Sequence, residues 1–270
     1  MYVGSVQRSK ATWLSGNLVP KEYEIEISES SGVRHLHFSS DWVQGAMRIA
    51  RPYALELEYT REMMLPLLLC EPEWPREVLL IGLGAGSLTK FLWRYRPDSQ
   101  LTVVEIDPRI ETVARLHFKL PDDPRIRLLI ADGADFVAAT RFRYDLILVD
   151  GFDADARAGR LDTVPFYADC RSRLNPGGLL CVNLLSRRKD YLRSIERIKD
   201  AFDGHTIAFP SCNSGNAIAL AHDGPFTDRP TLDELTDAAR RLRKATTLDL
   251  APTLARLANA GGFSSGAISF

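Results

Sequence analysis

The amino-acid sequence predicts an α/β protein whose core is a mainly parallel sheet, with a small β-hairpin region before it and helices after it. Two observations predict this fold. Between about residues 73 and 222, short apolar runs alternate with segments of helical character, as in a parallel sheet covered on both faces. The first run, 78–83, leads into Gly82-Leu83-Gly84-Ala85-Gly86, and a glycine-rich turn after the first strand is typical of nucleotide-binding sheets.

Seven apolar runs are predicted to be the strands of this sheet. Seven strands suit the methyltransferase variant of the Rossmann-like fold. The predicted strands are 78–83, 101–106, 126–131, 144–149, 178–184, 205–209 and 217–221. The predicted helices between them include 87–95, 108–118, 163–174 and 188–202.

The segment before the sheet reads as a hairpin followed by a linking helix. Apolar and polar residues alternate over Tyr23–Ile27 and again over Val33–Phe38, with a turn signal between them, which is the pattern of two paired strands. A helical pattern then extends from Pro52 to Leu69, with Pro66 as a kink or an end. We therefore assign residues 1–72 to an N-terminal strand region with its linking helix.

The C-terminal part is predicted to be helical. Gly224, Pro225 and Pro230 mark a boundary, so 73–224 is expected to be the catalytic domain and 225–270 a helical extension. Residues 231–260 have helical character, and the last ten residues read as a loose tail. The basic cluster at 240–244 is better explained as a solvated helix face than as a nucleic-acid site.

Composition excludes several classes of function. The 270 residues are 45% hydrophobic and carry a formal net charge of −1, so we expect no nucleic-acid partner and no anionic membrane surface. The N-terminus has no continuous apolar segment, and the most apolar stretch, 63–70, is too short to span a bilayer. We expect a soluble, cytoplasmic protein.

No metal site is expected. The four cysteines form no C-x-x-C pair and have no zinc-ligand spacing. His35 and His37 share one strand face, but no third ligand accompanies them.

Acidic residues at the ends of the first strands predict an adenosine site. Ligands of open α/β sheets bind outside the carboxyl ends of the strands. Glu105 ends the second strand, roughly twenty residues after the glycines, where an acid grips ribose hydroxyls. Asp132-Gly133 ends the third, where a carboxylate can accept from an adenine amino group. Neither G-x-G-x-x-G nor a phosphate-binding loop occurs, so the ligand is expected to carry no pyrophosphate, as in S-adenosylmethionine and its relatives.

The fourth strand ends in two further carboxylates. Asp150 closes the run YDLILVD, and Asp153 follows three residues later. Such acids are sometimes merely solvated. Beside a cationic ligand, however, two carboxylates can hold an amine-rich substrate, because ammonium groups pair well with oxygen acceptors.

Several motifs in the same order resemble the spermidine synthase (polyamine aminopropyltransferase) family and its bacterial relatives. The resemblance covers roughly residues 20–222. Its matching stretches are VLLIGLGAG, VVEID, ADGADF, YDLILVDGFD and FYADCRSRLNPGG, with Val43-Gln44 and Tyr59.

The resemblance implies a role for each matching position. Asp150 is expected to be the catalytic residue that faces the attacking amine, with Asp153, Tyr167 and Tyr59 on the substrate side; Tyr167 as a mere core aromatic is an equally good interpretation. The residues expected to contact the thioadenosine part are Gln44, Gly82, Gly84, Gly86, Glu105, Asp132 and Gly133.

The sequence also departs from the family pattern. Ala85 stands where family members carry an acid that pairs with the ammonium of decarboxylated S-adenosylmethionine. Either another group, such as Asp150 or Asp153, holds that ammonium, or the ligand is S-adenosylmethionine itself. The stretch Tyr59-Thr60-Arg61-Glu62 and the segment 154–159 also differ from the family, so the amine specificity is open.

Three functions follow from this reading. The first is an aminopropyltransferase that uses decarboxylated S-adenosylmethionine as a co-substrate, with no tightly bound cofactor, and a small amine such as putrescine as acceptor. The alternatives are a methyltransferase that uses S-adenosylmethionine, favoured by Ala85, and a non-catalytic sensor that keeps only the pocket. A homodimer is expected from the resemblance alone.

Overall fold

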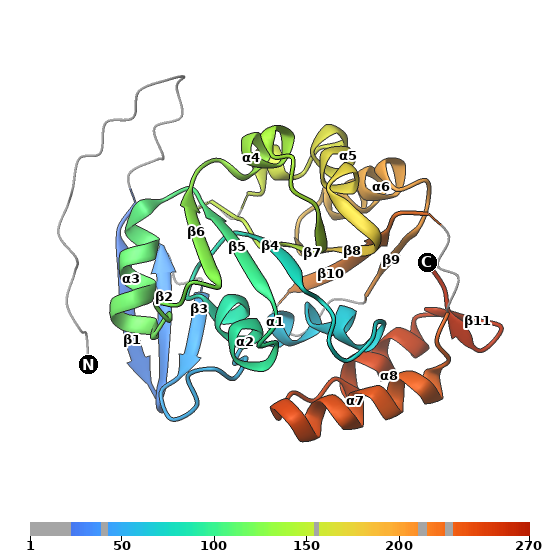
Figure 1. Cartoon of the computed structure of the whole chain (residues 1–270), viewed down its shortest axis with the longest axis horizontal. Coiled ribbons are helices and arrows are strands. Elements are labelled where there is room, and N and C mark those ends of the chain that lie inside the picture. The colour runs from blue at the N-terminus through green and yellow to red at the C-terminus, as the bar shows by residue number, and fades with distance from the viewer. Residues whose placement is uncertain (1–22, 39–42, 154–156, 210–214, 225–228) are drawn as a thin grey trace.

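A seven-stranded sheet covered by helices on both faces forms the centre of the molecule (Figure 1). The computed structural model describes residues 23–38, 43–153, 157–209, 215–224 and 229–270. The strand order is β6-β5-β4-β7-β8-β10-β9. All pairs from β6 to β8 are parallel, whereas β10 is antiparallel to both of its neighbours. The predicted fold class is confirmed.

Each of the seven predicted runs forms a strand. The largest difference concerns β8, which begins four residues before the predicted position because its first residue, Leu174, already pairs with Tyr144 across an irregularity in the ladder. The strands are β4 (Glu77–Ile81), β5 (Gln100–Glu105), β6 (Ile126–Ile130), β7 (Tyr144–Val149), β8 (Leu174–Leu185), β9 (Thr206–Ala208) and β10 (Asn216–His222).

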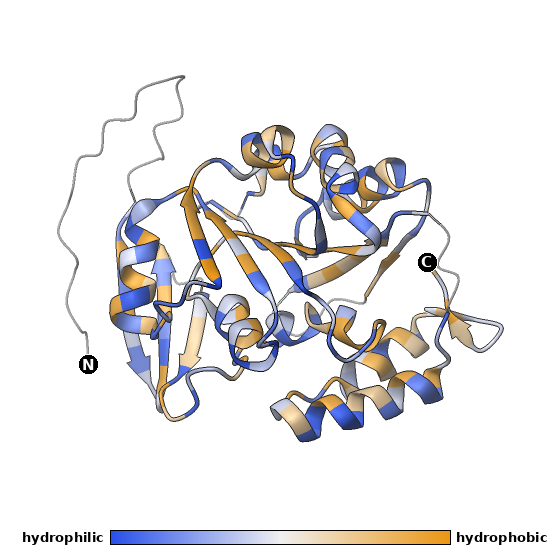
Figure 2. Cartoon of the chain, in the orientation of Figure 1, coloured by the Kyte–Doolittle hydropathy of each residue, from blue (hydrophilic) through white to orange (hydrophobic). Residues whose placement is uncertain are grey.

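Side chains that alternate along the strands build two separate core layers. In β4, Val78 and Leu80 belong to one hydrophobic cluster, and Leu79 and Ile81 belong to the other. The first layer packs under α2 and α3, and the second packs under α4, α5 and α6. Figure 2 shows the strands as mostly hydrophobic between these helices. The helices are α2 (Ser87–Tyr95), α3 (Pro108–Phe118), α4 (Gly133–Ala139), α5 (Val164–Ser172) and α6 (Tyr191–Ala201).

The chain reverses its direction of travel across the sheet between β4 and β7. It runs outward through β4, β5 and β6 and then returns to place β7 on the other side of β4. Such a switch point opens a crevice at the carboxyl ends of the strands, which is where open α/β sheets bind ligands.

The N-terminal segment forms a three-stranded antiparallel sheet of β1 (Ile25–Ser30), β2 (Val33–Phe38) and β3 (Val43–Arg48). The predicted hairpin is confirmed, and β3 adds a strand to it. The helix predicted over 52–69 is wrong in its extent, because only α1 (Glu58–Glu62) and the 3₁₀ turn η1 (Leu65–Leu68) form, whereas the interruption predicted at Pro66 is present. Pro66 explains the break, since its ring would clash with the carbonyl of Glu62 in a continuous helix.

The C-terminal segment forms α7 (Leu232–Thr246) and α8 (Ala251–Asn259), followed by a short hairpin of β11 (Phe263–Ser264) and β12 (Ala267–Ile268). The predicted loose tail is therefore wrong, because Ile268 is fully buried and its backbone N–H donates to Pro230. In Figure 1 α7 and α8 lie on the side of the sheet that carries α1 and α2. Among the described residues, no helix is both long and apolar enough to cross a membrane.

Candidate active site

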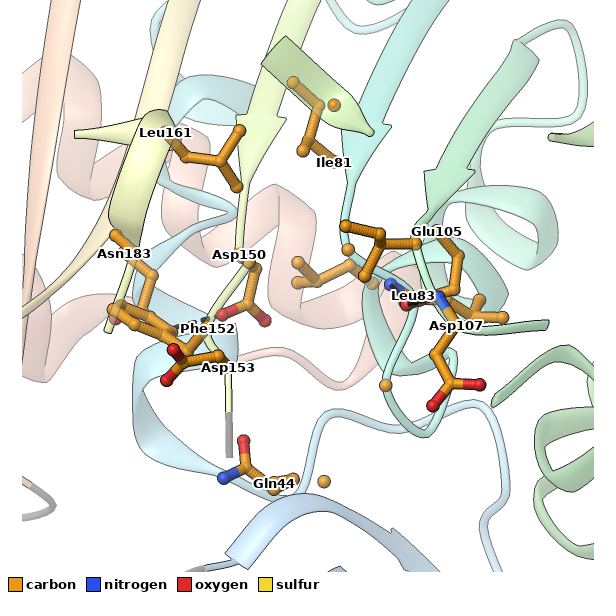
Figure 3. A pocket seen from close by; sticks show the side chains of 18 of the residues that line it. Gln44, Ile81, Leu83, Glu105, Asp107, Asp150, Phe152, Asp153, Leu161 and Asn183 are labelled. Atoms are coloured by element: carbon orange, nitrogen blue, oxygen red, sulfur yellow. Dashed lines mark hydrogen bonds between the residues drawn. The ribbon is translucent and has the colours of Figure 1, made fainter. Parts of the chain in front are cut away.

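A cleft of about 700 Å³ opens at the carboxyl ends of the strands, where the sheet meets β3 and α1. It brings together all the predicted site residues except Gly86 and Tyr167. Figure 3 shows Asp150 and Asp153 in one part of the cleft and Glu105 with Asp107 in another. The lining residues predicted from sequence are Gln44, Tyr59, Gly82, Gly84, Glu105, Asp132, Gly133, Asp150 and Asp153.

The glycine turn that follows β4 packs closely against the end of β7. Gly82 has φ of +96°, and a Cβ atom built on it would lie 2.2 Å from the backbone oxygen of Asp150. A side chain at this position would therefore push β4 and β7 apart. Gly86 lies behind the turn, with φ of +67° at the start of α2, and does not line the cleft.

The buried side chain of Glu105 stabilises the glycine turn through a hydrogen bond to its backbone. Its Oε2 atom accepts from the backbone N–H of Leu83, and Oε1 accepts from that of Asp107, both at 2.9 Å. Burial raises the pKa of Glu105, while these two N–H groups oppose the shift by stabilising the ionised form. Each carboxylate oxygen has two acceptor positions, so Glu105 keeps acceptor capacity for a hydroxyl in the cleft.

Asp132 already has protein partners for both oxygens. Its Oδ1 atom accepts from the backbone N–H groups of Ala134 and Asp135, at 2.8 and 3.1 Å, and so caps α4. Its Oδ2 atom lies 3.1 Å from the guanidinium of Arg160, which also pairs with Asp135. Any base amino group that reaches Asp132 competes with Arg160.

Asp150 sits at the end of β7 with two side-chain donors. Asn183 Nδ2 donates to Oδ1 at 2.7 Å, and the hydroxyl of Tyr59 donates to Oδ2 over a longer 3.3 Å. Burial raises the pKa of Asp150, and the bonds from Asn183 and Tyr59 lower it. The carboxylate is thus partly dehydrated yet provided with donors that favour its ionised form.

Two asparagines of this site are absent from our sequence predictions. Asn183 is buried in β8, and its Oδ1 atom accepts from Nδ2 of Asn216 on β10 at 2.9 Å. This bond fixes the amide so that its N–H group faces Asp150. The available signal was a lone amide inside the apolar run Leu179–Leu185, since buried polar side chains need partners.

Asp153 lies at the exposed edge of the cleft. Its Oδ1 atom accepts from the backbone N–H of Arg157 at 2.8 Å, so one of its oxygens closes a turn of the loop that follows β7. The sequence departs from the family pattern over 154–159; of these, 157–159 are described and begin at this turn, and 154–156 fall outside the described residues.

The structure does not bring Tyr167 to the cleft. Its ring is fully buried, and its hydroxyl donates to Asp162 at 3.0 Å. Tyr167 packs beside Phe166 in the core layer under α5. The core interpretation therefore describes this residue, because no part of it lines the pocket.

Ala85 lines the cleft with a methyl group and no charge. It is 2% exposed and packs directly against β3, since a Cβ atom built on Gly45 would lie 2.5 Å from the Ala85 Cβ atom. Asp150 and Asp153, the two acids predicted for the amine side, line the same cleft.

The described residues contain no group of three or more His, Cys, Asp or Glu side chains arranged to hold a metal ion. Cys70, Cys170 and Cys181 are free thiols, and Cys212 lies outside the described residues.

Comparison with known proteins gives a consistent result. The family model for the spermine/spermidine synthase domain matches residues 57–202. The polyamine aminopropyltransferase of Neisseria meningitidis serogroup B is 36% identical over 235 residues, which cover 87% of this chain and 89% of that protein. The enzyme of the same name from Chromobacterium violaceum is 38% identical over 212 residues, which cover 78% of this chain and 79% of that protein.

Solved structures share the fold. A spermidine synthase in complex with the transition-state analogue AdoDATO superposes with a TM-score of 0.72 at 20% identity, covering 97% of this chain and 87% of the other. The family model covers more than half of the chain, and the curated relatives align over most of their own length. This chain therefore belongs to the spermine/spermidine synthase family.

Proposed function

We propose that the protein transfers an aminopropyl group from decarboxylated S-adenosylmethionine to a small amine such as putrescine and releases methylthioadenosine. The observation that carries this proposal is the partly buried carboxylate of Asp150, which shares one cleft with the glycine turn and Glu105. The names of the curated relatives support it. The spermidine synthase that shares the fold was solved with the transition-state analogue AdoDATO, which agrees with the same reaction class.

The nucleoside is proposed to lie over the glycine turn. Gly82 and Gly84 let a ligand approach the backbone, because no Cβ atom intrudes. The spare acceptor capacity of Glu105 suits ribose hydroxyls. In this proposal Gln44, Asp132 and Gly133 complete the nucleoside side, and the sulfonium compound is a co-substrate rather than a resident cofactor.

The amine is proposed to bind at Asp150 with Asp153 and Tyr59 beside it. An alkylamine with a pKa near that of lysine, about 10.4, is mostly protonated at neutral pH, and only the neutral form is nucleophilic. The carboxylate of Asp150 orients the nitrogen and accepts its proton as the nitrogen becomes more acidic during bond formation. Holding both reactants in line supplies much of the rate.

The bond changes balance as a single displacement. The amine nitrogen forms a bond to the methylene carbon beside the sulfonium, and the bond from that carbon to sulfur breaks. Its electron pair stays on sulfur, which gives neutral methylthioadenosine. The nitrogen loses one proton, which passes to Asp150 and then to solvent.

A product assay separates this proposal from its alternatives. Purified protein is incubated with decarboxylated S-adenosylmethionine and putrescine or spermidine, and the nucleosides are separated by chromatography. We expect methylthioadenosine to appear only when amine is present. The methyltransferase alternative is not favoured by the relatives; it predicts S-adenosylhomocysteine from S-adenosylmethionine instead. The sensor alternative predicts ligand binding without either product.

The acceptor, the assembly and the location belong to the same proposal. The acceptor is a small polyamine, the enzyme is a homodimer, and it works in the cytoplasm. The acceptor and the homodimer rest on the family resemblance, and the location rests on the composition of the chain. Analytical ultracentrifugation at micromolar concentration tests the homodimer directly, because a monomer would give a mass of 30.2 kDa, half that of the expected dimer.

A further inference from the structure

The helix α1 carries a cleft residue but has little means of holding its own position. It spans five residues and has no side-chain hydrogen bond at its N-cap. A helix this short is marginal by itself, because nucleation costs more than one turn of hydrogen bonds returns. Tertiary contacts must therefore set the orientation of α1 and of the Tyr59 hydroxyl that reaches Asp150.

A buried ion pair joins α1 to the C-terminal helices, whereas Arg61 of α1 donates to the backbone of the preceding residues Leu55 and Glu56. Glu62, the last residue of α1, is 1% exposed, and its Oε1 atom pairs with Nη2 of Arg256 on α8. The two residues lie 194 positions apart in the sequence. Arg256 also lies outside the region 57–202 that the family model matches.

The ion pair between Glu62 and Arg256 is expected to add little to the stability of the fold. Within the described structure, Oε2 of Glu62 and Nε of Arg256 are buried without a hydrogen-bond partner, so the pair makes one contact where a bidentate one is possible. A buried ion pair with unsatisfied atoms gains little over apolar side chains of similar volume. Its directional contact, unlike apolar packing, fixes how α1 is turned.

Tyr59 and Glu62 are three residues apart, so they lie on neighbouring positions of the same helix face. An anchor at Glu62 therefore acts within the same helical turn that carries Tyr59. We infer that Arg256 is a positioning residue: through Glu62 it orients α1 and holds the Tyr59 hydroxyl at Asp150, so that the C-terminal helices shape the amine side of the cleft. This inference rests on the proposed function for its kinetic test but not for its structural one.

A double-mutant cycle between Arg256 and Tyr59 gives the kinetic test. We expect Arg256→Met to lower kcat/KM for the amine by about fivefold, the effect of one weakened hydrogen bond, with KM for the sulfonium substrate unchanged. In a Tyr59→Phe background the same substitution should have no further effect, because the hydroxyl it positions is gone. Additive losses would overturn the inference.

Three further variants separate positioning from folding. Arg256→Lys should restore most of the activity, since the pair uses a single donor. Arg243→Met on α7 breaks an ion pair with Asp249 within the same helical unit and should leave kcat/KM unchanged. If Arg256→Met fails to fold because Glu62 is left as a buried unpaired charge, the variant Glu62→Leu with Arg256→Met should fold and show the same loss. Wild-type activity in that variant would refute the positioning role.

A spectroscopic measurement decides the inference without turnover. The Cζ resonance of Tyr59, assigned by its loss in Tyr59→Phe, is followed in protein with ¹³C-labelled tyrosine. We expect it to shift in Arg256→Met and to stay in place in Arg243→Met. An unchanged Tyr59 resonance in Arg256→Met would overturn the inference. Absence of methylthioadenosine release by the wild type would instead refute the proposed function. The spectroscopic test of the positioning role of Arg256 does not depend on that outcome.

Discussion

The Nδ2 atom of Asn183 lies 2.7 Å from Oδ1 of Asp150, and Asn216 holds the Asn183 amide in the orientation that makes this contact. The catalytic carboxylate of our proposal is therefore supported by two strands, β8 and β10. The support is directional, because an amide turned the other way would present an oxygen to the carboxylate.

Removal of the Asn183 amide should shift the pH dependence of the reaction. Burial raises the pKa of Asp150, and the hydrogen bond from Asn183 lowers it. Asn183→Ala removes a donor to a charged group, so the pKa of Asp150 rises further. The acidic limb of the kcat/KM profile should therefore move to higher pH, by about one pH unit or more for the loss of a charge-assisted hydrogen bond. A pH series of initial rates measures this.

Asn175→Ala is the matched control for Asn183→Ala. Asn175 lies on the same strand and donates to Asp145, away from the cleft. Its replacement should leave the pH profile in place. Equal shifts in the two variants, or an unmoved limb in Asn183→Ala, would contradict the assigned role of Asn183.

The carboxylate of Glu105 should matter both for stability and for nucleoside binding. In Glu105→Gln the amide NH₂ group must face one of two backbone N–H donors, from Leu83 or Asp107. We expect the free energy of unfolding to fall by about 1–3 kcal/mol, the cost of one unsatisfied buried group. Urea unfolding measures this, and calorimetry should show weaker binding of methylthioadenosine. Glu111→Gln on the half-exposed face of α3 should change neither.

The close approach of Gly82 to β7 gives a test of the glycine turn. Gly82→Ala meets both a positive φ and the backbone oxygen of Asp150 at 2.2 Å from the built Cβ atom, whereas Gly204→Ala meets only a φ of +86° in open space. The control should lose about 1–3 kcal/mol of stability from strain alone. Gly82→Ala should lose more than this and should bind methylthioadenosine poorly, by thermal unfolding and calorimetry. Equal losses would argue against the close approach.

Lys90 should make stability depend on pH. It is buried in α2, where its Nζ atom donates to the backbone oxygen of Phe118, and burial together with Lys119 lowers its pKa to about 7. Between that pH and about 10.5 the unfolded chain binds a proton that the folded state does not. Wild-type stability relative to Lys90→Met should therefore rise by about 1.4 kcal/mol per pH unit across this window and level off below it. Parallel curves from urea unfolding would contradict this.

Much of the fold follows from local pattern. The apolar runs located all seven strands, and the predicted helices 87–95 and 108–118 matched α2 and α3. Buried strands and amphipathic helices can be predicted because the spacing of their apolar residues along the sequence is characteristic. Two expectations failed. The helix expected from Pro52 begins only at Glu58, although its interruption near Pro66 was predicted, and the last residues are ordered by a backbone hydrogen bond to Pro230. The division into three domains and the roles of the site residues stay predictions.

The site divides in the same way. Acids at strand ends, such as Glu105 and Asp150, were visible because the carboxyl ends of parallel strands meet at one edge. Asn183 and Asn216 were missed, because an amide in an apolar strand does not reveal its partner until the antiparallel pairing of β10 with β8 brings the two together. Tyr167 has a family match in sequence but a core position in space.

The most direct test of the central claim compares turnover and binding in Asp150→Asn. This substitution keeps the shape of the side chain but removes the proton acceptor at the end of β7. We predict that amine-dependent release of methylthioadenosine falls by about 10²-fold or more, while methylthioadenosine still binds with wild-type affinity by calorimetry. Turnover near the wild-type rate in Asp150→Asn would contradict the account.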